Sequence, residues 1–171
     1  MTEPRAVRVF DYSSPEQFQA EICPLREPAV LRGCPLGSCS EAWPSPGYLA
    51  GRLEGVVRPV HLTRETNMNF LQRNFTYHTM ELSQLVVRAS EGSEEGQEKL
   101  YLRAVSEENP RTKPVSLEDD FPSISGDFSL PAGLLPPQSV FSSVLRVSSG
   151  DVRVWTHYDV MDNIYCQIVG L

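Results

Sequence analysis

The stretch WTHYDVMDN, at residues 155–163, holds a histidine and an aspartate two positions apart, His157 and Asp159. Side chains two positions apart in a β-strand point to the same face, so a strand here would bring an imidazole and a carboxylate together. Two imidazoles and one carboxylate on one face of an octahedron, with the other positions open, form the metal site of non-haem Fe(II) oxygenases. The stretch therefore predicts a strand that carries two of three iron ligands.

The residues before this stretch favour a β-hairpin. Apolar runs at 141–147 and 152–155 are separated by Ser148, Ser149, Gly150 and Asp151, which are residue types that favour tight turns. We expect the second strand of this hairpin to lead directly to His157.

The rest of the chain predicts short elements, because fourteen prolines and eleven glycines interrupt it. Apolar patterning predicts strands at 6–10, 28–33, 58–62 and 99–105, and the strand at 28–33 is expected to be buried. It also predicts two helices. The first starts at Ser13 or Ser14 and ends by Pro24, and the second spans 80–90 and is capped by Thr76 or Thr79. Loops are expected at 34–48, anchored by Trp43, at 91–98, which should be flexible and solvated, and at 106–137. The fold class is mainly β with flanking helices (α+β).

Charge limits the classes of partner. The chain has 171 residues, enough for one domain, and a formal net charge of −7 with a pI near 5.0. An acidic protein does not attract a polyanion through its overall field, so any RNA contact must be local. The arginines that could face phosphates, or else lie scattered on the surface, are Arg52, Arg58, Arg64 and Arg73.

Several other polar residues have ordinary structural explanations. Cys23, Cys34, Cys39 and Cys166 form no C-x-x-C pair, no secretory leader precedes them, and no apolar stretch is long enough to span a membrane. We therefore expect free thiols in an intracellular protein, cytoplasmic or nuclear, without membrane contact. His61 and His78 are interpreted as polar sheet or loop residues, and Glu118, Asp119 and Asp120 as a solvated acidic turn.

The run WTHYDVMDNIYCQIVG at 155–170, with SVFSSVLRVSSGDVRVW before it, resembles the first metal-binding strand of the jumonji-C oxygenases. The similarity extends to EKLYLRAVSEENPR at 98–111, NFLQRNFTYHTMELSQLVVRA at 69–89 and REPAVLRG at 26–33. Within that family the chain is similar to the tRNA wybutosine hydroxylases. The resemblance implies a cupin-type double-stranded β-helix, truncated after its first metal-binding strand. Residues 1–137 would supply the N-terminal helices and strands, and 138–171 the incomplete start of the β-helix with the His-x-Asp motif.

The resemblance also implies a set of site residues. His157 and Asp159 would bind Fe(II), while Tyr101 and Asn163 would contact the co-substrate 2-oxoglutarate. From the residues alone, Tyr101 is an aromatic strand residue. Val154 occupies a position where some relatives have a hydroxyl. The family's second histidine ligand and its co-substrate lysine would lie beyond Leu171, so we expect these 171 residues to be inactive and poorly stable by themselves.

Three functions stay open at this point. The chain is a part or short form of a hydroxylase that modifies the wybutosine side chain at position 37 of phenylalanine tRNA, a jumonji-C hydroxylase that acts on protein side chains, or a non-catalytic binding module that pairs with another subunit. The longer form of the tRNA enzyme could be a homodimer. Whether these residues are themselves an enzyme is therefore uncertain.

Overall fold

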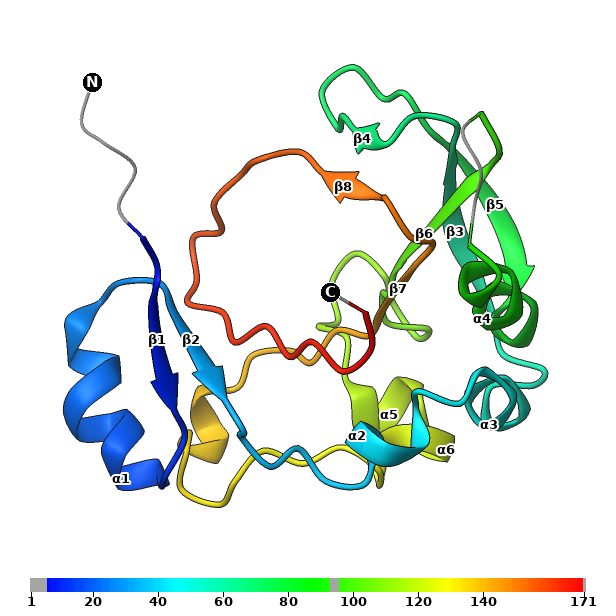
Figure 1. The fold of residues 1–171 in the computed structure, drawn as a ribbon. Coiled ribbons are helices and arrows are strands. Elements are labelled where there is room, and N and C mark those ends of the chain that lie inside the picture. Colours follow the sequence, from blue (N-terminus) through cyan, green and yellow to red (C-terminus); the bar gives the residue numbers. More distant parts are fainter. Residues whose placement is uncertain (1–5, 93–95, 171) are drawn as a thin grey trace, which may run out of the picture.

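The computed structural model describes residues 6–92 and 96–170, and two of its strands form a small unit at one end of the molecule (Figure 1). Strands β1 (Arg8–Asp11) and β2 (Ala29–Arg32) pair in parallel. A helical segment connects them: α1 (Pro15–Gln17), a π-helical turn η1 (Phe18–Ile22) and a 3₁₀ turn η2 (Cys23–Leu25). The hydroxyl of Ser14 accepts a hydrogen bond from the Gln17 amide, so the predicted N-cap is confirmed.

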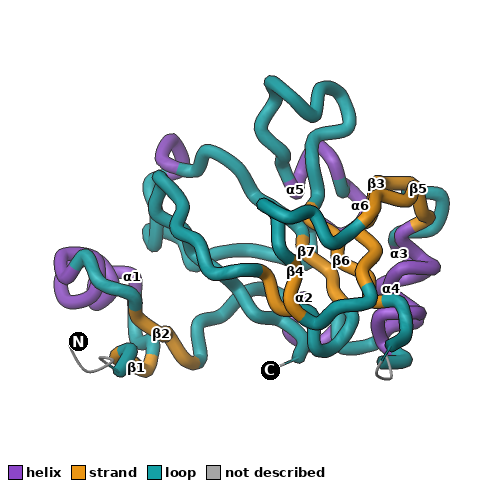
Figure 2. The backbone as a smooth tube through the Cα atoms, turned by 90° about the horizontal axis from the view of Figure 1, so that it is seen from above, coloured by secondary structure: helices purple, strands orange, loops and turns teal. Residues whose placement is uncertain are grey.

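The strand predicted at 28–33 is present, but the expectation that it is buried was wrong. Val30 of β2 and Val9 of β1 are both exposed, and the burial of β2 alternates between half-buried and exposed. A two-stranded sheet buries a strand completely only when other elements cover both of its faces. Figure 2 shows that β1, β2 and α1 lie at one end of the molecule, away from the strands of the larger sheet.

The larger sheet has the order β5-β3-β6-β7, and its neighbouring strands are antiparallel. Its strands are β3 (Val57–Thr63), β5 (Thr76–Glu81), β6 (Lys99–Arg103) and β7 (Arg146–Ser148). The predicted strands at 58–62 and 99–105 are thereby confirmed with shifted ends. Thr76 and Thr79 lie in β5 and do not cap the following helix, so that prediction was wrong.

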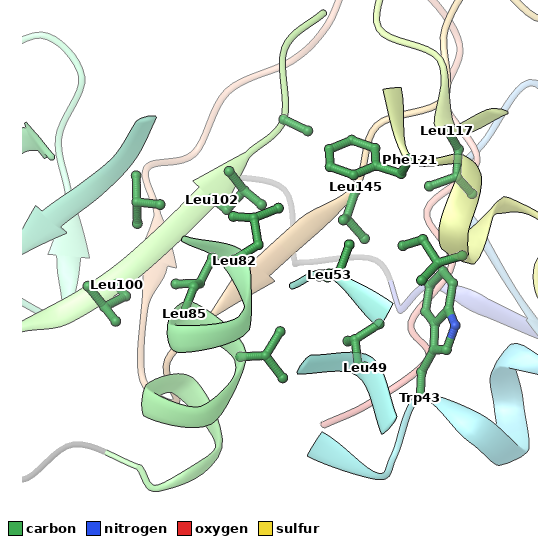
Figure 3. Close-up of a cluster of buried hydrophobic side chains, with 14 of the residues drawn as sticks. Trp43, Leu49, Leu53, Leu82, Leu85, Leu100, Leu102, Leu117, Phe121 and Leu145 are labelled. Atoms are coloured by element: carbon green, nitrogen blue, oxygen red, sulfur yellow. The ribbon is translucent and has the colours of Figure 1, made fainter. Parts of the chain in front are cut away.

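Helices cover one face of this sheet and form the core with it (Figure 3). Helix α4 (Leu82–Ser90) confirms the amphipathic helix predicted at 80–90, and it buries Leu82, Leu85 and Val86. Strands β3 and β6 contribute Val60, Leu62, Leu100 and Leu102 to the same cluster. Because side chains alternate along a strand, His61 and Tyr101 belong to the opposite face of the sheet.

The loop predicted at 34–48 contains helix α2 (Cys39–Ala42) and the start of α3 (Pro46–Arg52). Trp43 is buried in the core, as expected of an anchor. The excursion at 106–137 includes two short helices, α5 (Leu117–Asp120) and α6 (Pro122–Ser125), and the 3₁₀ turn η3 (Pro137–Ser139) follows. Of the loop predicted at 91–98, residues 93–95 lie outside the described residues.

The prediction of a solvated acidic turn was wrong for Asp120. Its carboxylate is buried and accepts hydrogen bonds from the backbone amides of Glu107, at 2.8 Å, and Ser116, at 2.9 Å. Glu118 and Asp119 are exposed, as expected. The three acids are adjacent, so composition does not distinguish them, and only the helical geometry of α5 turns Asp120 inward.

The predicted hairpin at 141–155 does not form among the described residues. Strand β7 starts only at Arg146 and pairs with β6, whereas β8 (Arg153–Val154) pairs in parallel with β4 (Asn67–Met68). The turn between them is present, with Asp151 at a φ of 66°. The turn therefore sends β8 to the edge of β4 in a separate two-stranded sheet, whereas β6 is already paired on both sides, by β3 and β7.

Among the described residues, no helix has the length and apolar composition that crossing a bilayer requires. Each of the four cysteines is a free thiol, and Cys39 is buried.

Candidate functional site

Residues 155–170, which hold the His-x-Asp motif, contain no helix or strand. The prediction of a strand at this motif was therefore wrong. Backbone amides of Arg153 and Trp155 donate hydrogen bonds to the carbonyl oxygens of Thr66 and Met68, and no strand pairing of the described residues continues beyond Trp155. In Figure 1 the orange and red arc after β8 runs toward β1 and β2 and returns to the C-terminus near β7. A strand requires a neighbouring backbone edge, and none of the described strands pairs with this arc.

The two predicted metal ligands are both exposed within this segment. The Nδ1 atom of His157 lies 2.7 Å from the backbone carbonyl oxygen of Trp155. The Asp159 carboxylate accepts a hydrogen bond of 2.8 Å from the side-chain amide of Asn163, which also lies 3.3 Å from the carbonyl oxygen of Met161. The structure thus brings Asn163, a predicted co-substrate residue, to the carboxylate of a predicted metal ligand.

An ion pair connects this segment to the small β1–β2 unit. The guanidinium of Arg26 donates two hydrogen bonds to the Asp162 carboxylate, at 2.7 and 3.1 Å. Arg26 follows η2 with a left-handed backbone, at a φ of 51°. The hydrogen bonds that Arg26 donates to the Asp162 carboxylate raise the pKa of Arg26 above its ordinary value. Sequence reasoning missed this contact, because the two residues are 136 positions apart.

Tyr101, the other predicted co-substrate residue, lies in β6 and is only 5% exposed. Its hydroxyl oxygen accepts a hydrogen bond of 3.1 Å from the guanidinium of Arg146 in β7. Burial raises the pKa of Tyr101, while the charges of Arg146 and Arg103 oppose that effect. The phenol of Tyr165, which follows the His-x-Asp motif in the sequence, also raises it.

His61 is the centre of an aromatic cluster beside Tyr101, which sequence reasoning missed. Its ring centroid lies 4.5 to 5.8 Å from those of Tyr77, Phe75, Tyr101 and Phe70. Its Nδ1 atom lies 3.0 Å from the carbonyl oxygen of Tyr101, and burial lowers its pKa. The sequence signal that could have indicated this cluster is the three aromatic residues within 70–77. His78, by contrast, is an exposed residue of β5, as predicted.

The candidate phosphate-facing arginines do not form one set. Arg58 is buried, stacks on the ring of Phe121 and donates to Glu107 at 2.7 Å. Arg52, Arg64 and Arg73 are exposed. Because Arg58 is engaged in the core, the four arginines do not form one phosphate-facing set, and the alternative of scattered surface arginines holds for the other three.

His157 and Asp159 supply two of the three protein ligands of the predicted iron site. One imidazole and one carboxylate are ligand types that non-haem iron uses. Within residues 6–92 and 96–170, no group of three histidine, cysteine, aspartate or glutamate side chains could hold a metal ion. The ligand types therefore fit, but the set within the described part of the chain is incomplete.

Residues 15–171 match the profile of the cupin-like domain, and the chain belongs to that family. This confirms the predicted fold class, a mainly β structure with a few helices of the cupin type. The sheets and flanking helices described above agree with it.

More specific similarity is found to proteins named for wybutosine synthesis. The chain is 37% identical over 169 residues to tRNA wybutosine-synthesizing protein 5 of Danio rerio, covering 96% of this chain and 51% of the relative. It is 38% identical over 162 residues to the protein of the same name from Homo sapiens, covering 92% and 50%. It is 45% identical over 146 residues to tRNA wybutosine-synthesizing protein 4 of Neurospora crassa, covering 84% and 12%. The chain thus spans about half the length of the protein 5 relatives.

Proposed function

We propose that this chain is part of an Fe(II)- and 2-oxoglutarate-dependent hydroxylase that acts on the wybutosine side chain at position 37 of phenylalanine tRNA. The observation that carries the proposal is the similarity, over 96% of the chain, to a protein named for wybutosine synthesis. The Neurospora crassa relative bears the name of the same process. A His-x-Asp pair within a cupin-like domain supports the reaction class.

His157 and Asp159 would hold the iron, and the third ligand would lie outside the described residues. When bound, the iron supplies an oxidation in which O2 places one oxygen atom in a substrate C–H bond and the other in succinate, as 2-oxoglutarate loses CO2. The protein's part is to bind and orient the reactants and to exclude competing reactions.

Asn163 would position the Asp159 carboxylate. Its amide donates one hydrogen bond to Asp159 Oδ2, which leaves the other carboxylate oxygen for a metal. Hydrogen bonds to ligating carboxylates fix their orientation, so loss of the amide should weaken metal binding. This role adds to the co-substrate contact that the resemblance implies for Asn163.

Exposed apolar side chains on the His-x-Asp segment support the idea that more protein covers it. Tyr158 is 90% exposed and Val160 98%, and Trp155 and Ile164 are also exposed. Large exposed apolar patches mark surfaces that bind another chain or segment. Such cover would come from the additional length of the relatives or from a second subunit, and the second case is the binding-module alternative. Light scattering combined with an iron determination separates the two: a metal-free assembly favours the binding module.

The proposal is tested with the full-length form, Fe(II), 2-oxoglutarate and phenylalanine tRNA that carries the wybutosine base. We expect succinate release and a gain of one oxygen atom on the base, measured by mass spectrometry of the digested tRNA. His157→Ala and Asp159→Ala should abolish both, whereas the matched control His78→Ala, at an exposed strand position, should retain them. Succinate release that depends on a peptide and not on tRNA would instead assign a protein hydroxylase.

A further inference from the structure

Two solvent-exposed aromatic rings lie on the face of the larger sheet that is opposite the core. The strand register places Tyr77 of β5, His61 of β3 and Tyr101 of β6 in one row across three neighbouring strands. Phe70, in the loop between β4 and β5, and Phe75, just before β5, pack onto this row. Phe70 is 40% exposed and Tyr77 is 62% exposed, whereas His61 and Tyr101 are buried. The cluster therefore has buried inner rings and two rings that a ligand can reach.

The two exposed rings rest on the same inner pair of rings. The centroid of the Phe70 ring lies 5.8 Å from that of His61 and 4.8 Å from that of Phe75. For the Tyr77 ring the corresponding distances are 4.5 and 5.7 Å. Aromatic rings at such separations attract each other in tilted or edge-on arrangements, so the inner rings support the exposed ones. Exposed apolar surface of this kind marks a binding site, and a flat ring favours a flat partner.

The loop that carries Phe70 is held in shape by two asparagines. The side-chain oxygen of Asn69 accepts hydrogen bonds from the backbone amides of Leu71 and Gln72, at 2.9 and 3.0 Å. The side-chain oxygen of Asn74 in turn accepts from the backbone amide of Asn69 at 2.8 Å. A loop that is ordered before binding loses less conformational entropy when a ligand arrives. The Phe70 ring is thus presented by a preordered loop.

Positive charge lies beside the cluster, in a chain whose net charge is −7. Arg73 belongs to the same loop as Phe70, and Arg103 projects from the same sheet face as Tyr101, two positions before it in β6. Both arginines are exposed, and within the described part of the chain neither forms an ion pair with an acid. Single-stranded nucleic acid is bound by this combination, because aromatic rings stack on bases and exposed cations contact phosphates. The charge therefore favours a segment of RNA as the ligand of these rings.

We infer that the rings of Phe70 and Tyr77 form a stacking surface for an unpaired nucleobase of RNA, with Arg73 and Arg103 beside it for phosphate contacts. This inference rests on the proposed function and deepens it, since the base would be the one whose side chain is hydroxylated. Stacking requires neither the metal nor the co-substrate. RNA binding and hydroxylation can therefore be measured separately.

The test is a fluorescence anisotropy titration of the full-length form with labelled phenylalanine tRNA at one fixed salt concentration. One RNA carries the wybutosine base at position 37, and a matched RNA has an abasic residue there. We expect the abasic residue to weaken binding about tenfold, because the stacking energy of one base is lost. Phe70→Ala and Tyr77→Ala should each weaken binding of the intact tRNA about five- to tenfold and should leave binding of the abasic tRNA unchanged.

Conservative variants separate stacking from simple burial. Tyr77→Phe keeps the ring and should retain the affinity for the intact tRNA. Phe70→Leu keeps apolar volume without a ring and should lose affinity as Phe70→Ala does. Leu71→Ala, at a neighbouring apolar side chain that is 77% exposed and carries no ring, is the matched control and should bind both RNAs as the parent protein does. Melting temperatures of all variants establish that each protein is folded.

Equal affinity of the parent protein for intact and abasic tRNA overturns the inference. Parent-like RNA binding by Phe70→Ala and Tyr77→Ala also overturns it, and a lower melting temperature in that case would show that other parts of the full-length chain cover these rings. An equal loss of affinity for both RNAs in the two variants would mean that the rings do not contact the base, which contradicts the stacking role. Base-dependent binding through both rings, without hydroxylation, would leave the stacking surface standing and remove the proposed reaction.

Discussion

The indole nitrogen of Trp43 donates a hydrogen bond of 3.0 Å to the carboxylate of Asp127, 84 positions later in the chain. The same carboxylate oxygen accepts from the hydroxyl of Tyr48 at 3.0 Å, and the backbone carbonyl of Asp127 accepts from the amide of Cys39 at 2.9 Å. One residue thus holds the loop after α6 against α2 and α3.

We expect Asp127→Ala to destabilise the protein by about 1 to 3 kcal/mol, because the buried N–H of Trp43 would lose its acceptor. Denaturant unfolding followed by tryptophan fluorescence measures the loss. Asp127→Asn keeps an acceptor oxygen and should cost less. Glu118→Ala, which removes an exposed acid on α5, is the matched control and should change little. Equal stabilities of Asp127→Ala and the control would contradict the assigned role.

Stability should fall in acid. The hydrogen bond from Trp43 lowers the pKa of Asp127 below the ordinary value of 3.8. Burial raises the pKa of Asp120, but the amides of Glu107 and Ser116, with nearby positive charge, outweigh it and lower the pKa overall. A carboxyl whose folded-state pKa is depressed stabilises the fold above its unfolded pKa and loses that effect as the pH falls through the folded-state value.

The free energy of unfolding should therefore be nearly constant above about pH 5 and decline as the pH falls below about 4. Unfolding experiments in buffers across this range measure the decline. The double variant Asp120→Asn, Asp127→Asn should be less stable at neutral pH and should show a shallower acid slope. A slope as steep as that of the parent chain would show that other carboxyls cause the decline.

The core that joins α4 to the sheet should respond strongly to truncation. Leu85 is fully buried among side chains of α4 and the neighbouring strands (Figure 3), so Leu85→Ala should cost about 2 to 5 kcal/mol through lost burial and the cavity left behind. Leu71→Ala removes the same atoms from a side chain that is 77% exposed and should cost under about 0.5 kcal/mol. A difference of less than about 1 kcal/mol between these variants would mean that the packing around Leu85 is looser than described.

The parts of the fold that sequence predicted best are those that periodicity alone determines. Helix α4 follows from Leu82, Leu85 and Val86 at helical spacing, and β6 from its short run of apolar and aromatic residues. Strand β5 was missed because its residues, TYHTME, are largely exposed and polar, so no apolar alternation marks them. It forms because the backbone of β3 offers an edge with six paired positions.

The candidate site was less predictable, because its geometry depends on partners distant in sequence. The spacing of His157 and Asp159 indicates a shared face only if a strand forms, and strand formation depends on a neighbouring edge. Asp162 meets Arg26, and Arg146 meets Tyr101, through pairings of segments far apart in the chain. The ligand and co-substrate roles of His157, Asp159, Tyr101 and Asn163 stay predictions.

Breaking the Arg26–Asp162 pair should loosen the His-x-Asp segment. This segment has no regular structure, and the pair bridges it to the N-terminal unit. Arg26→Glu should therefore speed chymotryptic cleavage at Tyr158 or Tyr165 severalfold, and added salt should speed cleavage of the parent chain, since exposed ion pairs are screened. The reversed pair Arg26→Asp, Asp162→Arg should slow cleavage again. Equal cleavage rates in all three proteins would show that the segment is held by other contacts.

Removing the hydroxyl of Tyr101 tests the co-substrate role in the full-length form. Tyr101→Phe keeps the buried ring beside His61 but removes the acceptor of Arg146 and the O–H that could reach a carboxylate. A hydrogen bond to a charged group contributes about 1.5 to 3 kcal/mol, which corresponds to roughly a 10- to 100-fold change in affinity. We therefore expect the KM for 2-oxoglutarate to rise by about that factor, with a smaller change in kcat and none in the KM for tRNA. Tyr77→Phe, which changes an exposed phenol of the same aromatic cluster, is the matched control. A rise in the tRNA KM alone would move Tyr101 from the co-substrate to the substrate side of the site.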